Sequence, residues 1–237
     1  MTEAASNLGR LHEASSAAVH ATLESGVAAE IGEAYAFVTE LEAWREPLAD
    51  QPEVVLFDTA HGEYLIALLN AVQGQYRNAF KGLRLVLELH LQGVLLSTDL
   101  LALKEWLGSG RHTIWARVVD DDGVFGNRMI NAFFATFRVP AARMRDSAKT
   151  TYSELSECIH GNVPVAIPLP EAICFHEPSV RLWLEKARSV RRLTHFAFML
   201  RYIGDIDEAA RHRLEPALVD VLGDIVEVRS FFGGRTE

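Results

Sequence analysis

The chain has 237 residues, nearly half of them apolar, and a formal net charge of −9. That apolar content supports a sizeable core and argues against a disordered protein. The acidity argues against a general nucleic-acid-binding protein, which needs a basic surface. However, 12 acidic and 2 basic residues fall within residues 1–63, and residues 64–237 are nearly balanced. The later part can therefore still carry a local basic patch.

Cysteine content and hydropathy indicate where the protein works. Residues 1–25 lack the apolar segment of a secretory signal, and no run of about 18 apolar residues occurs that could span a membrane. Cys158 and Cys174 are isolated and form no CxxC pair, so they predict neither a zinc site nor a needed disulfide. We expect a cytoplasmic protein that needs no cofactor and no metal.

Helical periodicity dominates the first half of the chain. Residues 8–25 and 27–46 are amphipathic, and we expect an acidic N-terminal helical pair within residues 1–50. Residues 60–97 form either one bent helix or two helices joined at Gly74. A short helix over residues 100–107, a solvated aspartate-rich turn at residues 120–123 and a short helix over residues 126–137 follow.

The second half continues the helical pattern with one interruption. Long helices are predicted over residues 140–160 and 179–202, and the Pro-rich residues 163–176 between them predict an extended loop or a small hairpin. A last helical region, residues 206–231, contains Pro216 as a candidate break. The sequence thus predicts an all-α, multi-helix antiparallel bundle. Its core, residues 58–232, either stands apart from the N-terminal pair or forms one domain with it.

A charged stripe marks the most apolar stretch of the chain, residues 67–96. Arg77, Lys81, Arg84 and Glu88 follow the spacing i, i+4, i+7 and i+11, which places them on one side of a helix. A stripe of charges on a mostly buried helix needs a partner. Arg84 and Glu88 either pair with each other to fix the helix packing or line a polar pocket.

The best candidate partner of this stripe is the end of the predicted helix over residues 140–160. Tyr152, Ser156 and His160 follow the spacing i, i+4 and i+8 and share one face of that helix. The helix dipole favours the charged form of a histidine at a helix C-terminus, which can act as a general acid or base or bind phosphate. The alternative is a histidine that only bonds a neighbouring carbonyl.

A basic helix over residues 181–201 is the third candidate site. Arg188, Arg191 and Arg192 lie almost on one face of it, which suits a contact with RNA, a nucleotide or an acidic protein. The alternative is pairing with the acidic N-terminal helices of the same chain or of a second subunit. We favour this pairing because the N-terminal quarter holds nearly all of the net negative charge.

Two motifs together resemble a known family. One runs from Gly74 to Glu88 as Gly-Gln-Tyr-Arg-Asn-Ala-Phe-Lys-Gly-Leu-Arg-Leu-Val-Leu-Glu, and the other from Tyr152 as Tyr-x-x-Leu-Ser-x-x-x-His-Gly. They resemble helical HEPN-type proteins of prokaryotic defence and toxin systems, over about residues 60–165. The resemblance implies an antiparallel helical bundle that dimerises to build a composite, metal-independent RNase site.

The catalytic signature that the resemblance implies is incomplete. It consists of an Arg shortly before a His, and His160 matches the His. The Arg is expected at position 153, 154 or 155, which hold Ser153, Glu154 and Leu155. Arg84 from the facing helix is our candidate for the missing charge. The family also contains non-catalytic members that act as binding or antitoxin-like partners.

Three functions are therefore open. The first is a HEPN-like homodimer, non-catalytic or dependent on a partner, that binds a partner protein in a defence or stress system and whose polar pocket is either structural or nucleotide-sensing. The second is a divergent ribonuclease in which His160 acts as general acid and base and Arg84 stabilises the phosphorane, with Glu88, Tyr152 and Ser156 around them. The third is a scaffold whose acidic N-terminus, residues 1–50, binds a basic partner.

Overall fold

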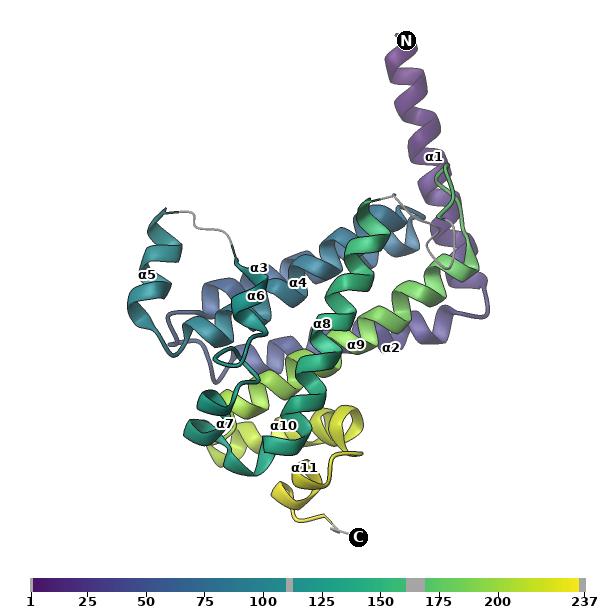
Figure 1. Cartoon of the computed structure of the whole chain (residues 1–237). Coiled ribbons are helices and arrows are strands. Elements are labelled where there is room, and N and C mark those ends of the chain that lie inside the picture. Colours follow the sequence, from purple (N-terminus) through teal and green to yellow (C-terminus); the bar gives the residue numbers. More distant parts are fainter. Residues whose placement is uncertain (1, 110–112, 161–168, 235–237) are drawn as a thin grey trace.

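The computed structural model describes residues 2–109, 113–160 and 169–234 (Figure 1). Within these ranges the chain forms eleven α-helices and one 3-10 helix, and it contains no strand. The all-α prediction is confirmed. No helix in the described ranges is long and apolar enough to cross a membrane.

The two N-terminal helices differ in how they meet the rest of the molecule. Helix α1, Glu3–Glu24, projects from the body, and its residues 2–13 are all exposed (Figure 1). Helix α2, Ala28–Arg45, buries Phe37 and Trp44 in the same hydrophobic core as the later helices. The acidic N-terminal segment therefore supplies one core helix and one projecting helix.

An antiparallel helical hairpin organises the core. Helices α3, Val54–Val72, and α4, Tyr76–Leu96, are joined at Gly74, whose φ of +75° suits glycine and few other residues. Glycines on α4 let the two helices approach closely, since a Cβ at position 82 would lie 2.8 Å from the Cβ of Ala67. Residues 60–97 are thus two helices and not one bent helix.

Three short helices follow the hairpin at one end of the molecule. They are α5, Leu100–Ser109; α6, Trp115–Val118; and α7, Asn127–Phe133, and the 3-10 helix Ala135–Phe137 comes after them. The three consecutive aspartates of residues 120–122 lie at an exposed turn between α6 and α7, as predicted. Helix α5 stands away from the bundle centre, and its closest helix is α4 (Figure 1).

The bundle is completed by α8, Arg138–His160, and α9, Glu177–Tyr202, which both pack on α4. Residues 193–200 of α9 are buried without interruption. Part of the Pro-rich segment, residues 161–168, lies outside the described residues. The described remainder, residues 169–176, is irregular and contains no strand, so it gives no support for a hairpin.

The C-terminal region forms α10, Glu208–Leu222, and α11, Val226–Phe231. The predicted break at Pro216 is wrong, because Pro216 lies inside α10. The chain leaves the helix at Gly223, where a Cβ would stand 2.3 Å from the carbonyl oxygen of Val219. A glycine at the end of the helix, and not the proline within it, divides this region.

Candidate functional site

Arg84 and Glu88 form a half-buried ion pair on α4. Arg84 Nε donates to Glu88 Oε1 at 3.0 Å, and the two side chains are 28% and 17% exposed. Arg84 Nη1 also donates to Ser156 Oγ of α8 at 3.3 Å. A half-buried ion pair contributes to stability only when its remaining donors also find acceptors, and Ser156 is one such acceptor. The pair therefore ties α4 to α8.

Tyr152 completes the contact between these helices. The guanidinium carbon of Arg84 lies 5.0 Å from the centre of the Tyr152 ring, a cation–π distance. The same ring stacks on Trp115 of α6, with centroids 4.2 Å apart and an interplanar angle of 10°. The hydroxyl of Ser156 donates to the carbonyl oxygen of Tyr152 at 2.7 Å. The structure thus brings together Arg84, Glu88, Tyr152 and Ser156, and their catalytic role stays a prediction.

Electrostatics limit what the Tyr152 phenol can do. Burial raises its pKa, and the negative charge of Glu88 raises it further against the opposing effect of Arg84. The phenol therefore stays protonated at neutral pH. It can donate a hydrogen bond to an anion, but it is a poor general base.

His160 is the last residue of α8, and its side chain lies outside the part of the chain that the structure describes. The helix end itself is contacted by the charged stripe of α4, since Arg77 Nη1 donates to the carbonyl oxygen of Ile159 at 3.3 Å. A cation at the last carbonyls of a helix is favoured by the helix dipole. Arg77 thus stabilises the end of α8 where the predicted catalytic histidine is located.

The positions that should hold a signature arginine have other roles. Leu155 is fully buried in the core. Glu154 accepts a hydrogen bond from Lys186 Nζ of α9 at 2.8 Å, and Lys186 also pairs with Glu185. An acidic residue paired across helices cannot supply the positive charge that RNA cleavage needs at this position.

The basic helix is α9, and its arginines pair within the chain. Arg188 Nη2 donates to Glu30 Oε2 of α2 at 2.5 Å, and Arg181 Nη1 donates to the other oxygen of the same carboxylate at 2.7 Å. The hydrogen bond from Arg188 is the main reason that the pKa of Glu30 is lowered. The acidic α2 is therefore a partner of α9, as the charge distribution suggested.

Arg191 and Arg192, which follow on the same helix, also make ion pairs. Arg191 Nε donates to Glu40 of α2 at 2.7 Å, and its Nη2 bonds Asp220 of α10 at 3.1 Å. Arg192 binds both carboxylate oxygens of Asp224, at 2.7 and 2.8 Å. With these partners in place, the three predicted binding arginines serve first to hold α2 and α10 against α9. The same ion pairs occupy acidic side chains of α2, which leaves fewer free carboxylates there for an external basic partner.

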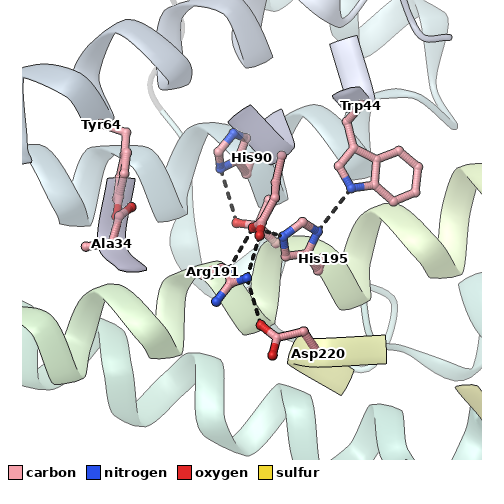
Figure 2. A network of polar contacts seen from close by, with 9 residues as sticks. Ala34, Trp44, Tyr64, His90, Arg191, His195 and Asp220 are labelled. Carbon is pink, nitrogen blue, oxygen red and sulfur yellow. Dashed lines mark hydrogen bonds and ion pairs between the residues drawn. The ribbon is translucent and has the colours of Figure 1, made fainter. Parts of the chain in front are cut away.

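A buried polar network that includes Glu40, the partner of Arg191, was not predicted from the sequence (Figure 2). The indole N–H of Trp44 donates to His195 Nδ1 at 3.0 Å, and His195 Nε2 lies 2.8 Å from Glu40 Oε2. An indole nitrogen only donates, so Nδ1 is unprotonated and Nε2 carries the proton that bonds Glu40. Burial lowers the pKa of His195 and Glu40 opposes this, so the imidazole stays neutral.

His90 of α4 is a second buried histidine that the sequence analysis passed over (Figure 2). Its Nδ1 lies 3.2 Å from Thr194 Oγ1, and its Nε2 has no hydrogen-bond partner in the described chain. Phe57 and Phe198 surround the ring. Burial, with smaller contributions from His195 and His61, lowers the pKa of His90 to about 3. Such a group has no access to solvent and serves the core, not catalysis.

The residues of the described ranges include no group of three His, Cys, Asp or Glu side chains that could hold a metal ion. Cys158 and Cys174 are both free thiols. Comparison with known proteins gave no match to any family model, curated protein or solved structure. The residues themselves and the two motifs that resemble HEPN-type proteins are therefore the features that bear on function.

Proposed function

We propose that the chain is a HEPN-like, non-catalytic component of a prokaryotic defence or stress system, which acts by binding a partner as a homodimer. The observation that carries this proposal is the environment of Arg84. Glu88, Ser156 and Tyr152 of the same chain already engage its guanidinium group. A charge held in this way stabilises the α4–α8 contact and is poorly placed to follow a developing phosphorane charge.

The exposed half of α1 supports a partner-binding role. Leu8 and Leu11 lie on it, and their side chains are 66% and 52% exposed. A helical segment of this length is only marginally stable without tertiary contacts. A partner that covers both leucines would stabilise it, and a second copy of the chain is the partner that the resemblance implies.

Deleting residues 2–13 tests this role, because α2 and the core remain intact. We expect sedimentation velocity to give a dimer for the full chain and a monomer for the truncated chain. Replacing Glu3 and Glu13 by Gln within the full chain is the control, because it keeps the leucines. A full chain that sediments as a monomer at every concentration would contradict the homodimer.

The ribonuclease is the second candidate, favoured by the contact of Arg84 with Tyr152 and Ser156, which lie about two turns and one turn before His160 on α8. An RNA-degradation assay separates the two functions. We expect no RNA cleavage by the wild-type chain above that of His160→Ala and Arg84→Gln. Cleavage by the wild type that both substitutions abolish, with Arg143→Gln as an active control, would establish the ribonuclease and refute the non-catalytic role.

A further inference from the structure

A cavity of about 810 Å³ lies between the C-terminal end of α4 and the short helices α5, α6 and α7. Its volume is in the range of small-molecule sites, which are several hundred to about 1,000 Å³. Arg84, Glu88, Tyr152 and Ser156 are not among its lining residues. The cavity is therefore separate from the cluster discussed above.

Aromatic and aliphatic side chains form the walls of the cavity. Trp106 lines it from α5 and Phe133 from α7, and Leu96 and Ile114 add aliphatic surface. The guanidinium carbon of Arg201 lies 4.4 Å from the centre of the Phe133 ring and holds that ring in place. Two large aromatic surfaces favour a planar aromatic ligand over a flexible acyl chain.

Gln92 brings to the cavity an amide that has no partner in the described part of the chain. The residue lies on α4, lines the cavity and is only 7% exposed. Its side-chain amide has no hydrogen-bond partner among the residues that the structure describes. The Gln92 amide is not fully buried, but Trp106 Nε1 in the same lining is, and it too has no hydrogen-bond partner in the described chain. A buried N–H without a partner is unfavourable, so this lining points to a ligand with a hydrogen-bonding group.

Two exposed arginines that have no partner within the described ranges also line the cavity. Arg117 of α6 and Arg128 of α7 are exposed, and neither has an ion pair or a side-chain hydrogen bond within the described ranges. This distinguishes them from the paired arginines of α9. Guanidinium groups bind carboxylates through paired, charge-assisted hydrogen bonds. The two side chains therefore favour an anionic group on the ligand.

Acidic residues also line the cavity, and two of them are already used in local turns. Asp99 accepts a hydrogen bond from the backbone N–H of Ala102 at 2.9 Å, and Asp120 accepts one from the N–H of Asp122 at 2.9 Å. Their carboxylates fix the start of α5 and the turn after α6. They also disfavour ligands with several negative charges, such as a triphosphate, relative to a single carboxylate.

We propose that this cavity binds a small aromatic carboxylate that carries a hydroxyl group at the end opposite its charge. The aromatic ring packs against Trp106 and Phe133, the carboxylate binds Arg117 and Arg128, and the hydroxyl reaches Gln92. This ligand offers hydrogen-bonding groups to Gln92, Arg117 and Arg128 without a metal or a covalent step. The proposal does not depend on the partner-binding role, and either can fail without the other.

Titration calorimetry with four related compounds tests each part of the ligand. The compounds are para-coumarate, which has both groups; cinnamate, which lacks the ring hydroxyl; cinnamyl alcohol, which lacks the ring hydroxyl and the charge and is compared with cinnamate; and octanoate, which lacks the ring. We expect para-coumarate to bind most tightly. Loss of the hydroxyl should weaken binding about fivefold and loss of the charge about tenfold or more, the effects of one neutral and one charge-assisted hydrogen bond.

Variants assign these effects to residues. The double variant Arg117→Gln/Arg128→Gln should weaken para-coumarate and cinnamate about tenfold and leave cinnamyl alcohol unchanged. Gln92→Leu should remove the advantage of para-coumarate over cinnamate. Arg143→Gln, an exposed arginine on α8 outside the cavity, is the matched control and should bind all compounds as the wild type does.

Three results would overturn the proposal. The first is no binding of any of the four compounds at millimolar concentration. The second is octanoate binding as tightly as cinnamate, which would exclude an aromatic site. The third is unchanged affinity for para-coumarate in the arginine double variant, with circular dichroism showing that the variant is folded.

Discussion

The buried imidazole of His90 should make the stability of this protein depend on pH in a way that one substitution can remove. His90 has a pKa of about 3 in the folded chain and an ordinary value of 6.5. Below pH 6.5 the unfolded chain takes up a proton that the folded chain cannot accept. The contribution of the neutral His90 to the free energy of unfolding is therefore complete above pH 6.5, and it is lost as the pH falls from 6.5 towards 3.

Over most of the range from pH 6.5 to pH 3, the size of this loss of stability depends only on the pKa of His90 in the unfolded chain. Each pH unit well below 6.5 lowers the free energy of unfolding by about 1.4 kcal/mol for one such group. Between about pH 7 and pH 5 the His90 contribution falls by about 2 kcal/mol. The folded pKa has almost no influence on this difference, because it lies well below pH 5.

The variant His90→Leu/Thr194→Val removes the titrating group and also the hydroxyl that would lose its partner, since Thr194 Oγ1 lies 3.2 Å from His90 Nδ1. Urea denaturation at several pH values gives the free energy of unfolding of both proteins. We expect the wild type to lose about 2 kcal/mol more than the variant between pH 7 and pH 5.

His212→Gln is the matched control, because His212 of α10 is exposed and its imidazole contacts water in both states. This variant should keep the pH dependence of the wild type. If the core variant also keeps it, His90 is not held neutral in the folded chain, and the reasoning from burial fails. Other acid-sensitive groups, such as Glu40, act equally in all three proteins and cancel in the comparison.

Urea denaturation can also measure three further substitutions. Two of them should lower the free energy of unfolding, and the third should raise it. Gly74→Ala should lower it by more than about 1 kcal/mol, since φ is +75° and a Cβ would lie 2.5 Å from Cys174 O. Tyr202→Phe should lower it by about 2 kcal/mol, because the buried Glu53 loses a donor at 2.7 Å. Gln92→Leu should raise it by less than about 1 kcal/mol, because it removes a mostly buried amide that has no partner in the described chain.

Surface positions supply the controls for these changes. Gly9→Ala lies on the exposed part of α1 with nothing within 4 Å of the added Cβ, so it should be neutral or stabilising. Tyr35→Phe removes an exposed hydroxyl of α2 and should leave the free energy of unfolding within about 0.5 kcal/mol of the wild type. A loss of stability in Gln92→Leu would show that its amide has a partner in the folded chain.

Local pattern was enough to predict the helices and two of their contacts. The 3.6-residue period identified the long helices because most of them have one buried face. The charged stripe of α4 predicted the contact with Tyr152 and Ser156, since half-buried charges require partners. The excess of acid in the N-terminal quarter predicted that α2 would pair with the arginines of α9. In each case charged side chains that one helix could not pair by itself found their partners on another helix.

The buried histidine network could not be read in the same way. His90 and His195 each lie in a buried, apolar stretch of a helix, and periodicity shows that such positions are buried without showing what they bond. The partners of His195, Trp44 and Glu40, come from a helix about 150 residues earlier in the chain. Pairing at that distance depends on the tertiary fold, and no spacing in the sequence encodes it.

The arginines show why the cavity was missed. A cluster of charge on a regular helix is conspicuous in a sequence, and Arg188, Arg191 and Arg192 were singled out for that reason. Charge concentrated on a helix that packs into a core must be neutralised there, and acidic residues of α2, together with Asp224 just after α10, do this. Arg117 and Arg128 are single residues on short helices, where nothing in the pattern distinguishes them. No neighbour neutralises them in the described chain, so these inconspicuous arginines remain available to the ligand that we propose.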